Sequence, residues 1–392
     1  MERPFSITKG EFCAKLSHLK RVIHANGYDA IYLESEGAMR WLTGYRHQVV
    51  DIAPQARTTV QAVVQVAPEY NITFFSDPWE ANRVHDILAA GIWNECDISA
   101  GYGGAEPDFS SPRLLSSQVD KRYAELERSI ISVLAEGLEG NQWDKLQWLV
   151  AESRKTLIEL STRLTEGMTG WDLRTELYHA YHERHIELNL VMLGLSGMQN
   201  HLHPVVMDDS RVENESIVKL VIGARYFDMF HSASQLVKIG GAPTRREVTV
   251  HRALQEASLR YANQYRVGND EAQLYESLGP IFAEVAKEYD LKGFEKSAYL
   301  HHAGGPLGPS GNRVFVVSRH GRRELIAHEQ FAVNPVDTLE FLKFELQGVV
   351  LPEGAPALID EFSWCPDERV YDTVPWHAES IRVPTILSSE GR

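Results

Sequence analysis

Two apolar runs on either side of a short mixed segment restrict the fold of this chain more than any other feature. The runs cover residues 217–222 and 234–239, both are rich in Val, Ile and Leu, and each is followed by a glycine. Short runs of this composition bounded by turn residues are typical of β-strands. We therefore expect two adjacent strands, forming a hairpin-like unit with a buried face, on either side of residues 223–233.

Two histidines precede this strand pair. His201 and His203 lie next to the turn residue Pro204. A histidine held beside a strand pair can transfer protons near neutral pH. Taken alone, either residue is more simply interpreted as a surface-loop histidine.

Length and charge limit the class of protein. A chain of 392 residues favours two domains over one. The formal charge of −15 argues against binding to nucleic acid or to an anionic membrane surface. No apolar run is long enough to cross a bilayer. We expect a small molecule as the binding partner.

The cysteines indicate the compartment. Cys13, Cys96 and Cys365 are scattered, odd in number and form no CxxC pair, which favours reduced thiols over a disulfide framework. The first residues contain no apolar segment typical of a secretory signal. We expect a cytoplasmic protein.

The first part of the chain predicts a small α/β domain. Apolar spacing predicts helices, short apolar runs predict strands, and a segment rich in Gly, Pro and Ser predicts a loop. The helices are expected at 9–26, 84–90 and 119–135, the strands at 30–33, 59–66 and 72–75, and the loop at 100–117. A second segment rich in turn residues, EGLEGNQ, follows at 136–142. We place the domain boundary there, near Gly140, giving domains 1–140 and 141–392.

The second part of the chain repeats a helix–turn–helix arrangement. Thr169 is a suitable N-cap residue for one of these helices. Helices are expected at 142–164, 170–185, 248–265 and 272–289, and a second set of strands within 300–326 and 331–350. The repetition suggests two related halves.

Six short motifs carry a family resemblance. They are MRWLTGY at 39–45, VIGARY at 221–226, FDMFHSASQLVKIG at 227–240, HHAGGPLG at 301–308, and the pair FAVNP at 331–335 with KFELQ at 343–347. In this order they resemble the creatinase / aminopeptidase P / prolidase family. The resemblance implies an α/β (α+β) protein in which a small N-terminal α/β domain is followed by a C-terminal pita-bread domain.

The resemblance also locates the metal ligands of the peptidases in this family, and most of them are missing. The five positions fall on Val221, Ser232, His302, Asn334 and Glu345. Valine has no donor atom, and a dinuclear site needs bridging carboxylates to offset two dications. We therefore predict that the chain uses no metal and no other cofactor.

Creatinase, one branch of the family, works without metal and supplies the roles that the resemblance implies. His203 matches its proton-transferring histidine, with His201 as a second possibility. Glu345 and His302 would orient the substrate and stabilise positive charge on it. Arg57 matches an arginine that reaches into the partner subunit's site, which predicts a homodimer. The expected substrate-binding set also includes His201, His301, Ser232, Asn334, Arg57 and Arg319. The chain departs from creatinase at Ser234 and Gln235, where the resemblance places a glutamate and an arginine of that enzyme.

These features predict metal-independent hydrolysis of a C–N bond in a small amide, amidine or N-substituted amino acid that carries a carboxylate. One alternative is an Xaa-Pro aminopeptidase or prolidase-like metallopeptidase with an atypical metal site. A second is a lyase or isomerase that uses His203 as a base at carbon. A third is a catalytically inactive pseudo-enzyme that keeps the site for binding.

Overall fold

A computed structural model of the chain describes residues 7–45, 58–195, 202–204, 210–309, 311, 317–359 and 361–389. Contacts within the chain divide it into two compact units. The first unit comprises Met1–Lys145, Phe227–Met229 and Gly308–Ser310, and the second comprises Leu146–Tyr226, Phe230–Leu307 and Gly311–Arg392. The domain limits 1–140 and 141–392 stay a prediction.

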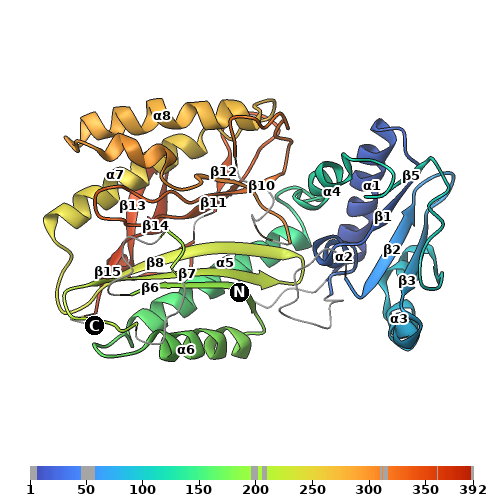
Figure 1. The fold of residues 1–392 in the computed structure, drawn as a ribbon, viewed down its shortest axis with the longest axis horizontal. Coiled ribbons are helices and arrows are strands. Elements are labelled where there is room, and N and C mark those ends of the chain that lie inside the picture. The colour runs from blue at the N-terminus through green and yellow to red at the C-terminus, as the bar shows by residue number, and fades with distance from the viewer. Residues whose placement is uncertain are drawn as a thin grey trace. The chain divides into compact units, whose positions relative to one another are not determined.

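The first unit is built on a five-stranded sheet with the order β4-β3-β2-β1-β5 (Figure 1). The central strands pair antiparallel, and both edge strands pair parallel with their neighbours. The strands are β1 (Ala30–Leu33), β2 (Val60–Gln65), β3 (Asn71–Ser76), β4 (Ser99–Tyr102) and β5 (Leu114–Leu115). The helices are α1 (Lys9–Ala25), α2 (Glu36–Thr43), α3 (Ala81–Ala90) and α4 (Tyr123–Ile131), with short 3₁₀ turns at Pro78–Glu80 and Ile92–Cys96.

Two expectations for this unit are wrong. The segment 100–117, expected as loop, contributes both edge strands, β4 and β5. Gly and Ala have low strand propensity, so the side chains of β4 give little strand signal in the sequence and the strand follows from backbone pairing with β3. The helix expected at 119–135 is shorter, since α4 ends at Ile131.

Four charged side chains are completely buried in the first unit. The ammonium group of Lys15 lies 2.5 Å from the carboxylate of Glu11 and 2.8 Å from that of Asp228. Lys145 lies 2.9 Å from Glu11 and also pairs with Asp228. We call these four residues the charged tetrad. Two positive and two negative charges balance, so each ion has a partner in place of the water that it has lost.

The strands of the second unit form two sheets and a hairpin. One sheet has the order β15-β8-β7-β6, the other β12-β11-β10-β9, and β13 pairs with β14. The strands are β6 (Glu187–Gly194), β7 (Ile217–Tyr226), β8 (Met229–Lys238), β9 (Gly304–Pro306), β10 (Gln330–Val333), β11 (Leu346–Val349), β12 (Ala357–Leu358), β13 (Tyr371–Trp376), β14 (Glu379–Pro384) and β15 (Ile386–Ser388).

The expected strand pair at 217–239 is present, but both strands are longer than expected. The turn lies at Phe227 and Asp228, so most of the segment 223–233 belongs to β7 and β8. Every residue of β8 is buried, including His231 and Ser232. A strand buried on both faces need not alternate apolar and polar residues, and the polar stretch therefore did not look like a strand.

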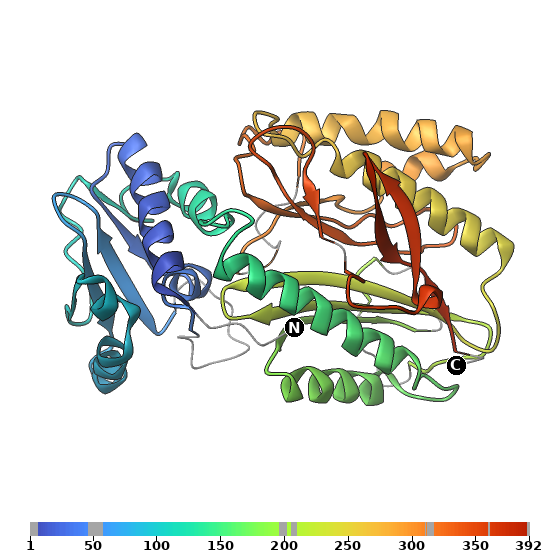
Figure 2. The same cartoon turned by 180° about the vertical axis from the view of Figure 1, so that it is seen from behind.

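Two helix pairs cover the strands of the second unit from opposite sides (Figures 1 and 2). They are α5 (Asn141–Ser161) with α6 (Gly170–Glu183), and α7 (Arg245–Ala262) with α8 (Glu271–Glu288). Thr169 caps α6 by a reciprocal pair of hydrogen bonds with Asp172, which confirms the predicted N-cap, and α7 and α8 begin with the same kind of capping box. Short 3₁₀ turns lie at Phe294–Tyr299 and Glu368–Val370.

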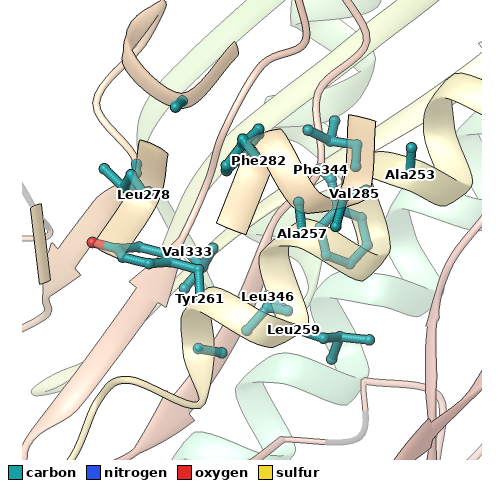
Figure 3. Close-up of a cluster of buried hydrophobic side chains, with 14 of the residues drawn as sticks. Ala253, Ala257, Leu259, Tyr261, Leu278, Phe282, Val285, Val333, Phe344 and Leu346 are labelled. Carbon is teal, nitrogen blue, oxygen red and sulfur yellow. The ribbon is translucent and has the colours of Figure 1, made fainter. Parts of the chain in front are cut away.

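The core of the second unit lies where α7 and α8 meet the strands (Figure 3). Tyr261 and Phe282 come from the two helices, and Val333 and Leu346 from β10 and β11. All four are almost completely buried. Truncating a buried phenylalanine typically costs about 3–5 kcal/mol, so this cluster fixes the strands that carry the site.

No helix in the described part of the chain is both long enough and apolar enough to span a membrane.

Candidate functional site

Three histidines of the second unit lie together, and we call them the histidine cluster: His203, His301 and His302. One nitrogen of each ring lies within 4.8 Å of the corresponding nitrogens of the other two. The rings of His301 and His302 are 4.0 Å apart between centroids, and those of His203 and His301 are 4.8 Å apart. His301 is buried, His302 is partly buried and His203 is exposed.

A close backbone approach holds the paired histidines in place. Gly304 lies two residues after His302 and has φ +120°. A side chain there would place its Cβ 2.0 Å from the backbone oxygen of Ala332 in β10. Only glycine allows β9 to pair at this distance, so the position of the histidine loop depends on Gly304.

Hydrogen bonds fix the proton positions in the cluster. His301 Nδ1 donates to the backbone oxygen of His302 at 2.7 Å, since a carbonyl oxygen only accepts. In a neutral ring, His301 Nε2 is then unprotonated. It lies 3.1 Å from His203 Nε2 and accepts its proton. The remaining nitrogen of His203, Nδ1, therefore carries a lone pair.

The environment keeps all three rings uncharged at neutral pH. Burial, followed by the positive charge of Lys343, lowers the pKa of His203 below its usual value. The same two causes lower the pKa of His301 to about 2 and that of His302 to about 4. A neutral imidazole accepts a proton, so the cluster consists of bases rather than cations.

A lysine–glutamate pair lies beside the cluster. Lys343 Nζ is 3.2 Å from Glu345 Oε1 and donates to the backbone oxygen of Asn334 at 3.3 Å. Ser232 Oγ donates to the same Glu345 oxygen at 3.4 Å. All four side chains are almost completely buried. Asp337 organises the turn ahead of Lys343 by accepting three backbone N–H groups through its carboxylate.

Several buried polar atoms here have no hydrogen-bond partner among the described residues. They are His302 Nδ1, Asn334 Oδ1 and Glu345 Oε2. An unpaired buried acceptor costs roughly 1–3 kcal/mol, and such atoms are a feature of sites that bind a polar molecule. The two oxygens would accept hydrogen bonds from N–H groups of a ligand.

A second lysine, Lys219, lies near the ion pair of Lys343 and Glu345. Lys219 on β7 is buried, and its Nζ donates to the backbone oxygen of Phe341 at 2.8 Å. Burial, and then the charge of Lys343, lower the pKa of Lys219 to about 8. Two neighbouring ammonium groups make this side of the site suitable for a carboxylate.

Some residues expected from the sequence lie elsewhere. Arg57 and His201 are outside the described residues. Arg319 is exposed, and its Nε donates to His320 Nε2 at 3.0 Å. Val221 is buried in β7.

Sequence reasoning missed Lys343 and Lys219. Each stands two residues before a family ligand position, Glu345 and Val221 respectively. In extended chain, residues i and i+2 lie on one face, so this spacing was a usable signal.

The residues present do not fit a dinuclear metal centre. Of the five ligand positions, only His302 and Glu345 keep a ligating side chain. The carboxylate of Glu345 is already paired with the ammonium group of Lys343. Two dications need bridging carboxylates, and the site offers a single carboxylate and a competing cation.

Comparisons with known proteins agree with this fold. The family profile described as "Metallopeptidase family M24" matches residues 148–356, which is more than half of the chain. A search of curated proteins found no match.

Solved structures with the same fold include three peptidases. The dipeptidase PepE from Mycobacterium ulcerans has a TM-score of 0.67 at 14% identity, covering 91% of this chain and 97% of that chain. The prolidase from Pyrococcus horikoshii has a TM-score of 0.63 at 12% identity, covering 88% and 97%. The X-Pro aminopeptidase from Thermotoga maritima has a TM-score of 0.62 at 15% identity, covering 95% and 99%. The chain belongs to metallopeptidase family M24, with the pita-bread fold of that family, and is a hydrolase of C–N bonds in which most of the family's metal-ligand positions are changed.

Proposed function

We propose that this protein hydrolyses a C–N bond in a small amide, amidine or N-substituted amino acid that carries a carboxylate, without a metal ion. The observation that carries the proposal is the hydrogen-bonded pair His203–His301, in which His203 Nδ1 is left as a lone-pair base. Lys343 and Glu345 occupy the neighbouring polar site as an ion pair.

The proton balance of this reaction requires one group that both accepts and donates. His203 Nδ1 takes a proton from water while the water oxygen forms a bond to the electrophilic carbon. The bond from that carbon to nitrogen then breaks, and the same proton passes from His203 to the leaving nitrogen. A group with a pKa near or below neutrality can perform both transfers.

The substrate class follows from charge and unpaired atoms. The ammonium groups of Lys343 and Lys219 favour a carboxylate. The unpaired oxygens of Asn334 and Glu345 favour N–H groups. A molecule with both is an amino acid derivative or a guanidino or amidino acid. His302 and Ser232 would complete the contacts.

Because the chain belongs to a metallopeptidase family, a metal-dependent peptidase is the second candidate. Prolidase and X-Pro aminopeptidase are among the structures with this fold. Such an activity would require the metal pair that the donor set of this site disfavours. The two candidates therefore predict opposite effects of a chelator.

The test is a substrate screen on metal-stripped protein. The panel contains N-substituted glycines, guanidino acids and small amides on one side and Xaa-Pro dipeptides on the other, with release of amine, urea or amino acid as the readout. We expect turnover of a compound from the first group in the presence of chelator. Turnover of Xaa-Pro dipeptides alone, and only after addition of Mn²⁺ or Co²⁺, would refute the proposal in favour of the second candidate.

We also propose a homodimer in which Arg57 or its neighbours complete the site of the partner. The support is the match of Arg57 to a family segment with that role. Light scattering at micromolar concentration should give twice the chain mass, and a monomer would contradict this. A cytoplasmic location stays a prediction.

A further inference from the structure

The histidine cluster has the donor geometry of a mononuclear metal site that differs from the dinuclear site of the family. Among the described residues it is the one group of three or more His, Cys, Asp or Glu side chains whose ligand atoms converge. Its donors are all imidazole nitrogens. Three histidines with one open position for water form a known type of zinc site.

The distances suit one ion. Two nitrogen ligands that each lie about 2.0–2.1 Å from Zn²⁺ are about 3.3 Å apart in tetrahedral geometry. His203 Nε2 and His301 Nε2 are 3.1 Å apart. The third ring needs only a modest side-chain movement, since its nitrogen lies within 4.8 Å of the other two.

The surroundings also suit a metal ligand set. The backbone oxygen of His302 accepts the Nδ1 proton of His301, which directs the lone pair of His301 Nε2 into the cluster. Such an outer hydrogen bond is the usual means by which a ligating histidine is oriented. His302 Nδ1 is buried without a hydrogen-bond partner among the described residues. His203 is exposed, which leaves a path for the ion to enter.

The nearby positive charge of Lys343 opposes a cation but does not exclude one. Glu345 lies 3.2 Å from the lysine and compensates its charge. Nitrogen donors favour Zn²⁺, Co²⁺, Ni²⁺ or Cu²⁺ over Mg²⁺ or Ca²⁺.

We infer that His203, His301 and His302 bind one zinc ion, and that the bound ion inhibits the enzyme. Coordination through His203 Nε2 moves the ring proton from that atom to Nδ1. The lone pair on Nδ1 is then lost, and His203 can no longer accept a proton from water. This inhibition rests on the proposed function, whereas the zinc site itself rests on the geometry alone.

The experiment is equilibrium dialysis of the metal-stripped full chain against Zn²⁺, followed by elemental analysis, with Co²⁺ absorption as a probe of coordination geometry. We expect one equivalent of zinc and a tetrahedral Co²⁺ spectrum. His203→Ala and His301→Ala should each weaken binding by at least about 100-fold, since loss of an outer hydrogen bond alone costs 10–100-fold. The exposed His320→Ala is the matched control and should bind like the parent.

Absence of zinc binding by the parent, or unchanged binding by both His203→Ala and His301→Ala, would overturn the zinc site. His203 is exposed, so His203→Ala keeps the test valid even if His301→Ala fails to fold. Zinc that binds in one equivalent but leaves turnover unchanged would support the site and refute the proposed role of His203 as the base.

Discussion

The charged tetrad of the first unit and the histidine cluster of the second unit are two groups of polar side chains that differ in how completely their polar atoms are paired. In the tetrad, two lysines face two carboxylates, and Asn141 and Gln142 donate further hydrogen bonds to those carboxylates. In the cluster, the uncharged rings of His203 and His301 share one hydrogen bond, and His302 Nδ1 has no partner among the described residues.

Polar groups with a structural role and polar groups with a functional role can be separated by their pairing. A fully paired buried network contributes to a unique fold, and breaking it leaves an uncompensated charge. Unpaired buried atoms beside neutral bases are available to hydrogen-bond a ligand. Removing a tetrad residue should therefore change stability, whereas removing a cluster residue should change turnover.

The largest expected effect is loss of stability in Asp228→Asn. Although burial alone raises the pKa of Asp228, the charges of Lys145 and Lys15 lower it to about 2. The substitution leaves two buried ammonium groups with one carboxylate and should cost about 3–5 kcal/mol, measured by urea unfolding. Asp367→Asn, at an exposed ion pair with Arg369, is the control and should barely move the midpoint.

The contribution of Asp228 to stability depends on pH over a defined range. Because the folded pKa of Asp228 is lower than its unfolded value, its contribution is complete above about pH 4 and is lost as the pH falls toward 2. An Asp228→Asn variant as stable as the parent at pH 7 would show that the tetrad is dispensable.

The next effect is on catalysis. His203→Gln keeps the bulk of the side chain but cannot carry the proton, so turnover should fall by roughly 100-fold or more. His201→Gln is the matched control and should do much less. Circular dichroism should show both variants folded. If His201→Gln abolishes turnover while His203→Gln is near the parent, the placement of the base is wrong.

A smaller effect concerns a buried imidazole that belongs to neither group. His251 on α7 is buried near Phe344, and burial lowers its pKa to about 4, with Asp372 opposing that shift. The unfolded chain binds the proton more tightly, so stability falls as the pH drops from about 6.5 toward 4. At pH 5 the loss is about 2 kcal/mol.

Urea unfolding at pH 7 and pH 5 measures this loss. His251→Gln should be less stable at pH 7 but should show a smaller change between the two pH values. Asp228→Asn should keep the parent's change over this range, because the pKa of Asp228 lies below it. An equal pH dependence in His251→Gln and the parent would contradict the assignment.

Much of the fold was accessible from the sequence because its signals are local. The helix periodicities and the capping residue Thr169 predicted the four helices of the second unit. Strand β4 was missed because its stability comes from pairing with β3. The middle of β7–β8 was missed because burial on both faces removes the alternation of polar and apolar residues.

The site was only partly accessible. The motifs located His203, His301 and His302, but the sequence could not show that the rings of His203 and His301 share a hydrogen bond, since this depends on a loop positioned by Gly304. The ion pair of Lys343 with Glu345 was also missed. Its two-residue spacing indicated a shared face in extended chain, but the sequence did not show that this face lies beside the histidine cluster.

The most direct test of the account is turnover measured on one preparation before and after complete metal removal, with metal content determined by elemental analysis. We expect full turnover at a metal content below about 0.1 equivalent per chain, and a decrease when zinc is added back. Turnover that vanishes on stripping and returns only with two equivalents of metal per chain would contradict it.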